Sequence, residues 1–341
     1  RKALENGDTL KDEINLGELF DNFLRQKRTA EKEYNTIRRY DSLIRCYLKP
    51  KFGHMQAKQL KPLHLTNTYN DWKENGRDGK PVSGKTVRHA HDLLRNILNW
   101  GVRKDLLSRN VAKSVENDDL PKVVNPKPIA LTDQQLRKLL ETALNPSSRS
   151  LKRGYLSAEP WFHPAVAFAA YMGTRRGETL AVHWRDVDFD KNEVKIQWSL
   201  TEAMDFKNTK TDQTRTLTMP PSLRDILEAH RERQDEERRF MGKGYKDQDL
   251  VFARVDGSPI DPWNFGEAVT ACIERAKVTD EHLTLHNLRD THGSLCVKAG
   301  VPIEVISKRL GHSNILVTAK RYLDVQDRDA EAAAAFGKLV G

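Results

Sequence analysis

The stretch GVPIEVISKRLGHSNILVTAKRYLD, residues 300–324, predicts two short helices joined by a tight turn. Apolar residues recur at helical spacing on both sides of the turn. Gly311 is the residue type that ends a helix in the left-handed conformation, and His312 follows it. Taken alone, the segment favours a helix-turn-helix reader of DNA. A lone tyrosine such as Tyr322 more often packs half-buried than reacts.

The preceding helix carries two basic side chains on one face. In LTLHNLRDTHGS, residues 283–294, His286 and Arg289 are three positions apart. Two positive groups on one face repel each other unless an anion lies between them, which favours a phosphate site. The alternative is a surface pair on a basic helix.

A third segment places an arginine at the start of a helix. In AAYMGTRRGETLAVHWRDVDF, residues 169–189, an apolar helix runs into Gly173, and Arg175 leads into a second helix that contains Glu178. A guanidinium beside a helix start suits phosphate binding, because the free backbone N–H groups there also attract an anion. The alternative is a structural ion pair between Arg175 and Glu178.

Strand patterns occur only in the middle of the C-terminal half. VDFDKNEVKIQWSL (187–200) and RTLTMP (215–220) alternate and are rich in β-branched residues, so they predict a small antiparallel sheet. Lys210 lies in or beside the polar turn between them, where a lysine is usually solvent-exposed. Helical patterns dominate elsewhere, which makes the predicted fold mainly α with a small antiparallel β-sheet.

The N-terminal half predicts a compact unit of four helices at about 16–27, 33–48, 63–74 and 85–104. Pro50 and Gly53 are expected to end the second helix. From Thr36 to Lys113 there are 17 Lys and Arg against 6 Asp and Glu, a net +11 that exceeds the +9 of the whole chain. This balance favours a polyanionic partner, most commonly nucleic acid. Candidate DNA contacts on these basic helices are Arg38, Arg39, Lys85 and Arg88.

The 341 residues divide by pattern into two domains and a linker. We expect residues 1–15 to be an N-terminal remnant, 16–115 the helical domain, 116–130 a proline-bearing linker, 131–325 the second domain and 326–341 a C-terminal tail helix. The sequence Thr132-Asp-Gln-Gln135 is a capping box that begins the second domain. The chain starts at Arg1 rather than Met, which indicates a fragment.

Composition excludes several classes of protein. No window of 18 apolar residues predicts a membrane span, and the first residues lack the apolar core of a signal peptide. Three widely separated cysteines indicate ordinary thiols in a reducing compartment. Neither a P-loop nor an acidic cluster spaced for two metals is present, so we expect no cofactor and no metal.

The ordered set of motifs resembles the tyrosine recombinase (phage integrase) family over about residues 15–325. Gly-Thr-Arg175-Arg-Gly-Glu178 is similar to its first arginine motif, and His286-Asn-Leu-Arg289 to its His-x-x-Arg box. The remaining matches are the hairpin lysine Lys210, Leu-Gly-His312 and, ten residues later, Tyr322. The resemblance implies an N-terminal helical core-binding (SAM-like) domain and a C-terminal tyrosine-recombinase catalytic domain.

The family's activity would be site-specific DNA recombination through a 3′-phosphotyrosyl intermediate. In this role Tyr322 is the nucleophile, Arg175 and Arg289 hold the phosphate, and Lys210 gives a proton to the leaving 5′ oxygen. His286 accepts the phenolic proton or orients the phosphate, and His312 donates a hydrogen bond to it. The covalent bond preserves the energy of the phosphodiester, so religation needs no ATP.

The resemblance also implies partners. These are double-stranded DNA recombination sites, three further copies of the chain in a tetramer on DNA, and accessory excision or DNA-bending proteins, but no membrane. The expected setting is the bacterial cytoplasm, at the nucleoid, and the expected element is a phage or a conjugative or integrative transposon. The tail 327–341 carries a small apolar patch that we expect to pack onto a neighbouring subunit, so its deletion should weaken assembly on DNA.

Three alternatives stay open at this point. Lys207 is a possible substitute for Lys210, because the segment after Lys210 has no close match to one pattern. A helix-turn-helix regulator without catalysis would give no special role to Arg175, Lys210 or Tyr322. A type IB topoisomerase would use similar chemistry to relax supercoils.

Overall fold

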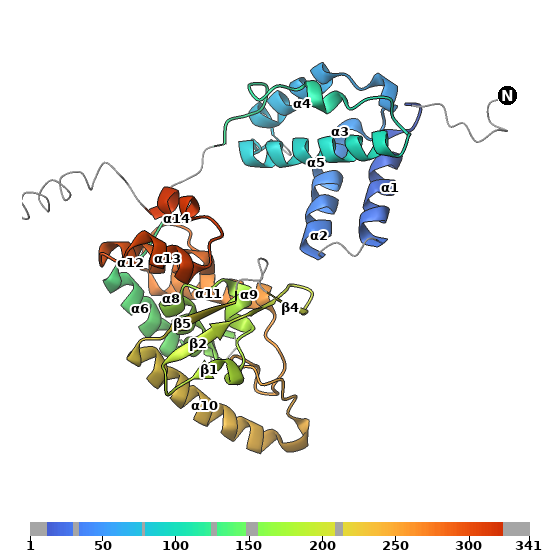
Figure 1. The fold of residues 1–341 in the computed structure, drawn as a ribbon. Coiled ribbons are helices and arrows are strands. Elements are labelled where there is room, and N and C mark those ends of the chain that lie inside the picture. The colour runs from blue at the N-terminus through green and yellow to red at the C-terminus, as the bar shows by residue number, and fades with distance from the viewer. Residues whose placement is uncertain are drawn as a thin grey trace, which may run out of the picture. The chain divides into compact units, whose positions relative to one another are not determined.

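The computed structural model describes residues 12–29, 34–76, 79–123, 128–147, 156–208 and 214–322. The chain divides into two units, Arg1–Pro126 and Lys127–Gly341, each with its own hydrophobic core. Both are mainly helical, and the described strands all lie in the second unit (Figure 1). Within the described ranges, no helix is long and apolar enough to cross a membrane.

The first unit is built on the four predicted helical regions. Its described elements are α1 (Leu16–Thr29), α2 (Tyr34–Leu43), a π-helical turn (Ile44–Leu48), α3 (Lys49–Phe52), α4 (Pro62–Glu74) and α5 (Gly84–Arg103), with 3₁₀ turns at Ala57–Gln59 and Val111–Ser114. The predicted apolar stripe of α1 is buried, with Leu19, Phe20 and Phe23 fully enclosed. Figure 1 shows α1 and α2 side by side, and α1 also contacts α3 and α5.

The prediction that Pro50 ends the second helical region is wrong. The helical path continues through a π-helical turn into α3 and ends at Phe52, just before Gly53. Pro50 lies in the first turn of α3, where a missing backbone N–H costs no hydrogen bond. The wider turn ahead of it, closed by the Lys49 N–H on the Ile44 carbonyl, lets the chain pass the proline ring.

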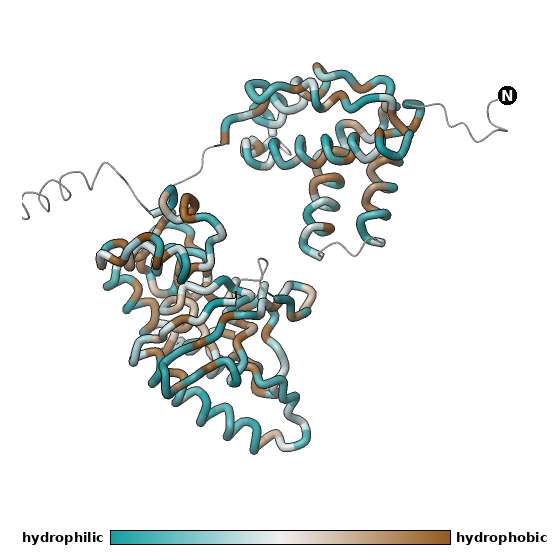
Figure 2. Tube along the Cα trace, in the orientation of Figure 1, coloured by the Kyte–Doolittle hydropathy of each residue, from teal (hydrophilic) through white to brown (hydrophobic). Residues whose placement is uncertain are grey.

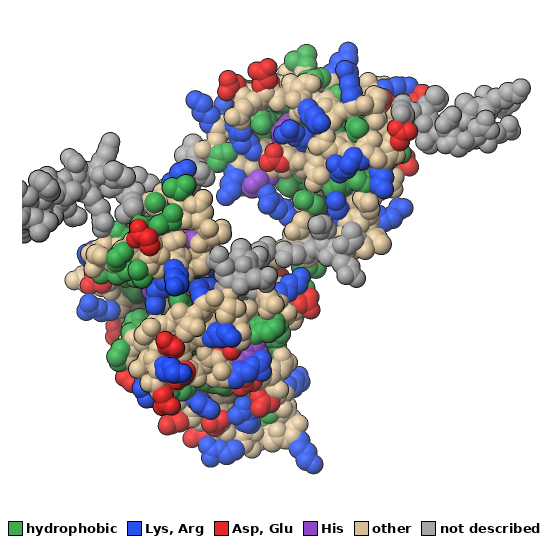
Figure 3. Space-filling view, in the orientation of Figure 1, with side chains coloured by type: hydrophobic (Ala, Val, Ile, Leu, Met, Phe, Trp, Pro, Cys, Tyr) green, Lys and Arg blue, Asp and Glu red, His purple; other side chains and the backbone are tan. Residues whose placement is uncertain are grey.

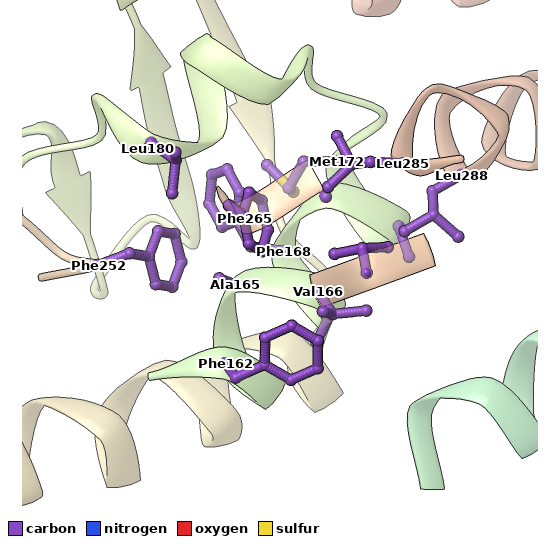
Figure 4. Close-up of a cluster of buried hydrophobic side chains, with 14 of the residues drawn as sticks. Phe162, Ala165, Val166, Phe168, Met172, Leu180, Phe252, Phe265, Leu285 and Leu288 are labelled. Carbon is purple, nitrogen blue, oxygen red and sulfur yellow. The ribbon is translucent and has the colours of Figure 1, made fainter. Parts of the chain in front are cut away.

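The second unit surrounds the apolar helix α8. Its described helices are α6 (Asp133–Leu144), α8 (Phe162–Met172), α9 (Arg176–Leu180), α10 (Pro221–Met241), α11 (Pro262–Ala276), α12 (Leu285–Lys298), α13 (Ile303–Leu310) and α14 (Ile315–Tyr322), with 3₁₀ turns at Leu156–Ala158, Trp184–Asp186 and Gly242–Gly244. The capping box at Thr132 starts α6 as predicted. Around α8, Phe162 and Phe168 pack with Phe265 and Phe252, and α12 adds Leu285 and Leu288 (Figure 4).

The predicted sheet forms as two small antiparallel sheets. One has the order β1 (Val187–Asp188), β2 (Glu193–Ile196), β5 (Arg215–Thr218), with Ile196 opposite Arg215. The other pairs β3 (Trp198–Leu200) with β4 (Phe206–Asn208). Arg215 and Leu217 of β5 point inward, while Thr216 and Thr218 are exposed. The inward arginine matters for the site described below.

The long helix α10 is polar over most of its length (Figure 2). Its inward side chains are Leu223, Leu227, His230 and Gln234. Gln234 accepts a hydrogen bond from the indole N–H of Trp184 at 2.6 Å, so the helix is anchored by both apolar and polar contacts. This helix therefore supports the unit from outside the candidate site.

Candidate active site

The joint between α8 and α9 is built on Gly173. This residue ends α8 with φ +63°, and a Cβ there would lie 2.7 Å from Cδ2 of His292. Glycine is required because both the left-handed conformation and the close approach exclude a side chain. The Gly173 carbonyl accepts a hydrogen bond from Nη1 of Arg289 at 2.8 Å. The first arginine motif and the His-x-x-Arg box therefore meet at this joint.

Glu178 is a buried carboxylate shared by two arginines. It accepts hydrogen bonds from the Arg175 backbone N–H at 2.9 Å and from Arg175 Nη1 at 2.7 Å. Arg215 Nη2 donates at 2.7 Å to Oε2, the oxygen that also accepts the Arg175 backbone N–H. Burial alone would raise the pKa of Glu178, but the hydrogen bonds and charges of Arg215 and Arg175 outweigh it and lower that pKa to about 2. The ion pair between Arg175 and Glu178, one of the two sequence interpretations, is thus present.

The C-terminus of α13 gathers three guanidinium groups. The carbonyl oxygens of three consecutive residues each accept a hydrogen bond from one arginine. Arg215 Nε donates to the Arg309 carbonyl at 2.9 Å, and Arg289 Nη2 donates to the Leu310 carbonyl. Arg175 Nη2 donates to the Gly311 carbonyl at 3.1 Å. The last carbonyls of a helix have no partner within the helix and carry the negative end of its dipole, so cations are favoured there. This shared anchor holds Arg175 close to Arg289 and aligns both.

Arg289 and Arg175 differ in exposure. Arg289 is only 3% exposed, and burial together with the charge of Arg175 lowers its pKa to about 10. It therefore stays charged at neutral pH. The Arg175 side chain is 48% exposed and can meet a ligand from solvent. A guanidinium has five N–H donors, so after these contacts each arginine keeps donors for an anion.

His312 lies in the turn after α13, beside these arginines. Its Nδ1 is 2.7 Å from Oγ1 of the buried Thr318. Burial, and then the charges of Arg289 and Arg175, lower the pKa of His312 to about 4. The ring is therefore neutral at pH 7 and has one N–H to donate.

His286 lies in the first turn of α12 and is solvent-accessible. Desolvation lowers its pKa; Asp290 opposes that shift, while the guanidiniums of Arg321 and Arg289 add to it. This histidine is neutral at pH 7, like His312, and its ring remains open to a ligand.

Tyr322 ends α14, and its phenol reaches α12. The hydroxyl donates a hydrogen bond to Oδ1 of Asp290 at 3.1 Å. Asp290 is buried and also receives Arg321 Nε at 2.6 Å and Nη2 at 2.7 Å. Burial, and then the charge of Asp290, raise the pKa of Tyr322 to about 12. Sequence reasoning missed Asp290 and Arg321, although each directly follows or precedes a predicted site residue.

The lysine candidates are less defined. Lys210 lies outside the described residues. Lys207, its alternative, is exposed on β4 opposite Ser199. Among the residues the structure describes, no group of three or more His, Cys, Asp or Glu side chains is arranged to hold a metal ion.

The four candidate DNA contacts of the first unit differ in surroundings. Arg38, Arg39 and Lys85 are exposed, and Arg39 of α2 and Lys85 of α5 both lower the pKa of His89 after its burial. Arg88 instead donates to the Pro121 carbonyl at 2.7 Å and to Asn117 Oδ1 at 2.6 Å. Figure 3 shows Lys and Arg side chains spread over the visible face of this unit, where they outnumber Asp and Glu.

Comparison with known proteins decides the family. Residues 130–329 match the phage integrase family, and residues 15–73 match the phage integrase N-terminal SAM-like domain. The chain belongs to the phage integrase family. Its members include tyrosine recombinases, enzymes that cut and rejoin DNA strands, and site-specific recombination is the activity of this chain. The mainly helical fold with small antiparallel sheets agrees with the sequence-based prediction.

Individual relatives support the same family and fold. A protein named tyrosine recombinase XerC-like from Caldanaerobacter subterraneus subsp. tengcongensis is 26% identical over 92% of this chain and 80% of its own length. The Tn1549 transposon integrase, solved with circular intermediate DNA, superposes with a TM-score of 0.73 at 17% identity, covering 96% of this integrase and all of that chain. A lambda integrase tetramer on a Holliday junction gives 0.66 at 13% identity over 95% and 80%.

Proposed function

We propose that Tyr322 attacks a DNA backbone phosphate held by Arg175 and Arg289, and that this integrase recombines specific sites of a mobile element through the 3′-phosphotyrosyl bond. The observation that carries the proposal is the anchoring of both guanidiniums on neighbouring carbonyls, Gly311 and Leu310. The Tyr322 hydroxyl reaches the helix that carries Arg289, because it donates a hydrogen bond to Asp290, the next residue of α12. Groups from four separate segments therefore converge where a phosphate would bind.

The two arginines supply the charge that the reaction needs. Cleavage builds negative charge on the non-bridging oxygens, and fixed N–H donors stabilise it most when they need not reorganise. Paired N–H donors of a guanidinium match phosphate oxygens. Arg289 remains charged at neutral pH, since its lowered pKa is still about 10.

The histidines and the lysine complete the mechanism. With its pKa near 4, neutral His312 donates a single N–H to a non-bridging oxygen. His286, exposed at the start of α12, orients the phosphate. Lys210 gives a proton to the departing 5′ oxygen, as the family resemblance implies. When a new 5′-hydroxyl attacks the phosphotyrosyl bond, these transfers run in reverse and the strand is rejoined.

The partner is double-stranded DNA, and the working assembly is a tetramer with one nucleophile for each strand cut. The Tn1549 integrase was solved with circular intermediate DNA and lambda integrase as a tetramer on a Holliday junction. The basic first unit, with Arg39 and Lys85 exposed, supplies the phosphate contacts that position the duplex. The source element is a phage or a conjugative or integrative transposon, and accessory proteins direct excision.

A covalent-trapping experiment tests the proposal. The protein is incubated with a nicked duplex of its recombination site and denatured in SDS, and we expect a covalent adduct that Tyr322→Phe abolishes. Tyr245→Phe is the matched control, because this half-buried tyrosine follows α10 and contacts Arg238. Adduct formation by Tyr322→Phe would refute the assignment. Specific binding without any adduct would support a DNA-binding regulator, and relaxation of plasmids lacking the site would support a topoisomerase.

A further inference from the structure

The phenol of the proposed nucleophile is in contact with a carboxylate. Tyr322 Oη donates to Asp290 Oδ1 at 3.1 Å, within the reach required of a proton acceptor. Asp290 is only 2% exposed, so the contact is shielded from water. Asp290 is not one of the residues to which the proposed mechanism gives a role. The Asp290 carboxylate therefore lies beside the attacking oxygen without an assigned role.

The carboxylate is held in one orientation. Arg321, one residue before the nucleophile, donates to both oxygens of Asp290, at 2.6 and 2.7 Å. Such a bidentate pair fixes the plane of the carboxylate as well as its position. Oδ1 is then shared between Arg321 Nε and the phenol. The helix that carries the nucleophile is thus tied to the helix that carries Arg289.

The tyrosine ring is held as well. A Cβ at Gly293 would lie 2.6 Å from Cζ of Tyr322 and 2.8 and 2.9 Å from its two Cε atoms. Gly293 and Asp290 are three residues apart on α12 and so share a face. The ring rests on bare backbone at Gly293, and its hydroxyl meets Asp290. Both contacts are made by the residues that follow Arg289.

The reaction needs an acceptor that is already in contact. With its pKa raised to about 12, the phenol is ionised in only about one molecule in 10⁵ at pH 7. A free phenolate is therefore a poor route to cleavage, and the proton has to leave as the oxygen attacks. A base assists this step only from hydrogen-bond distance.

We propose that Asp290 is the catalytic residue that accepts the phenolic proton of Tyr322 during strand cleavage, an assignment that rests on the proposed role of Tyr322. As the bond from Tyr322 Oη to phosphorus forms, the phenolic proton moves to Asp290 Oδ1. The bond from phosphorus to the 5′ oxygen breaks, and that oxygen leaves with a proton from Lys210 or water. Religation returns the proton from Asp290 to the phenol.

Several charged groups face this pair and bear on its pH dependence. Arg321 faces it from α14, and Arg289 and His286 face it from α12, while Arg175 at the start of α9 acts on His286. The guanidiniums keep their charge throughout the working range. His286 titrates below neutral pH and is the rival base, so it must be tested beside Asp290.

The test is the pH dependence of single-turnover adduct formation at saturating DNA. The substrate is a nicked duplex with sulfur in place of the bridging 5′ oxygen, because a thiolate leaves without a proton and the profile then reports the phenol alone. Asp290→Asn keeps the shape and removes the acceptor, so the rate at pH 7 should fall by about 10²–10³-fold. Its rate should then rise about tenfold per pH unit, as solvent must ionise the phenol, and approach the wild-type rate at high pH. Wild type should stay nearly flat above neutral pH.

Matched variants separate this role from a structural one. His286→Asn should lose rate without acquiring the tenfold slope. If Asp290→Asn is unfolded, Asp290→Asn combined with Arg321→Gln removes both members of the ion pair, so that neither charge is left without its partner. The proposal would be overturned if the pH–rate profile of Asp290→Asn ran parallel to that of wild type, or if its rate at pH 7 did not fall. An adduct that survives Tyr322→Phe, or its absence from wild type, would instead overturn the proposed function.

Discussion

At the scale of single residues, Arg215 explains how an exposed arginine can be held still. Its guanidinium is 7% exposed and binds both oxygens of Glu178, whose other contacts go to Arg175. It also lies against Gly311, where a Cβ would approach Nη1 to 2.9 Å. The Nε, Nη1 and Nη2 atoms of Arg215 thus all donate to protein oxygens. Its role is to support Arg175 through Glu178.

Arg215→Lys should therefore slow chemistry more than it weakens DNA binding. Lysine keeps the charge but cannot bind both carboxylate oxygens in one plane, so Glu178 and Arg175 are no longer fixed. A small displacement of a positioning group can cost about 10²-fold in rate. We expect a loss of this order in single-turnover adduct formation, with the gel-shift affinity nearly unchanged.

Arg176→Lys is the control for this variant. Arg176 pairs with the partly buried Glu202 at 2.8 Å but does not contact Glu178. Arg176→Lys should lower the free energy of unfolding by about as much as Arg215→Lys does, without a comparable loss in the rate of adduct formation. In an Arg175→Lys background, Arg215→Lys should have little further effect on the rate. If the two losses of rate were fully additive, Arg215 would not act through Glu178 and Arg175.

Sequence patterns predicted the motif residues but, apart from the ion pair between Arg175 and Glu178, not the contacts between them. Arg175, Arg289, His312 and Tyr322 could be found because each lies in a short recognisable phrase. Arg215 was predicted only as the first residue of a strand, although it is central to the site. Its partners are 37 and 94 residues away, and no local periodicity encodes such a pairing. Tertiary packing alone determines it.

At the scale of elements, His292 joins three helices beneath the site. Its Nδ1 donates to the Ala170 carbonyl of α8 at 3.2 Å, and its Nε2 accepts from Arg309 Nε of α13 at 3.0 Å. The ring is therefore neutral in the folded protein. Burial, and then the charge of Arg309, lower the pKa of His292 to about 4. Protonation would place an N–H against the guanidinium and break the link to α13.

This joint predicts that the second unit loses stability in mild acid. The folded pKa of about 4 lies below the ordinary 6.5, so the unfolded chain takes the proton first and stability falls as pH drops from 6.5 towards 4. The full effect is roughly 3 kcal/mol in the free energy of unfolding. Denaturant unfolding at several pH values should show the fall, and His292→Gln should reduce its slope by about one proton. Equal slopes for wild type and His292→Gln would contradict this role.

Element boundaries were predictable where the signal is local. The capping box at Thr132 starts α6 as expected, and Gly53 follows the end of α3. Pro50 does not end the helix, because the effect of a proline depends on the backbone conformation of the turn before it. A π-helical turn has no clear sequence signature, and the helix therefore ends at Phe52, four residues beyond the predicted end at Leu48.

At the scale of the whole molecule, charge and chemistry are divided between two units. The arginine cluster lies in the second unit, while Thr36–Lys113 of the first carries a net +11. Under the proposed function, the first unit supplies most of the sequence-independent affinity for DNA and the second unit breaks the bond. Each unit has a hydrophobic core of its own, built from the apolar side chains of its own segments.

The DNA affinity of the first unit should depend steeply on salt, and individual lysines and arginines should contribute separately. Arg39 and Lys85 are exposed beside His89 on neighbouring helices, so each can neutralise a phosphate. Each change, Arg39→Gln or Lys85→Gln, should reduce the slope of log affinity against log salt by about 0.9. Lys51→Gln is the control, because Lys51 already pairs with Asp71 at 2.7 Å. Gel shifts on cognate and unrelated duplexes at several salt concentrations measure the slopes. An effect confined to the cognate duplex would mean that these residues read bases, and equal slopes for all three variants would contradict a phosphate-binding face at α2 and α5.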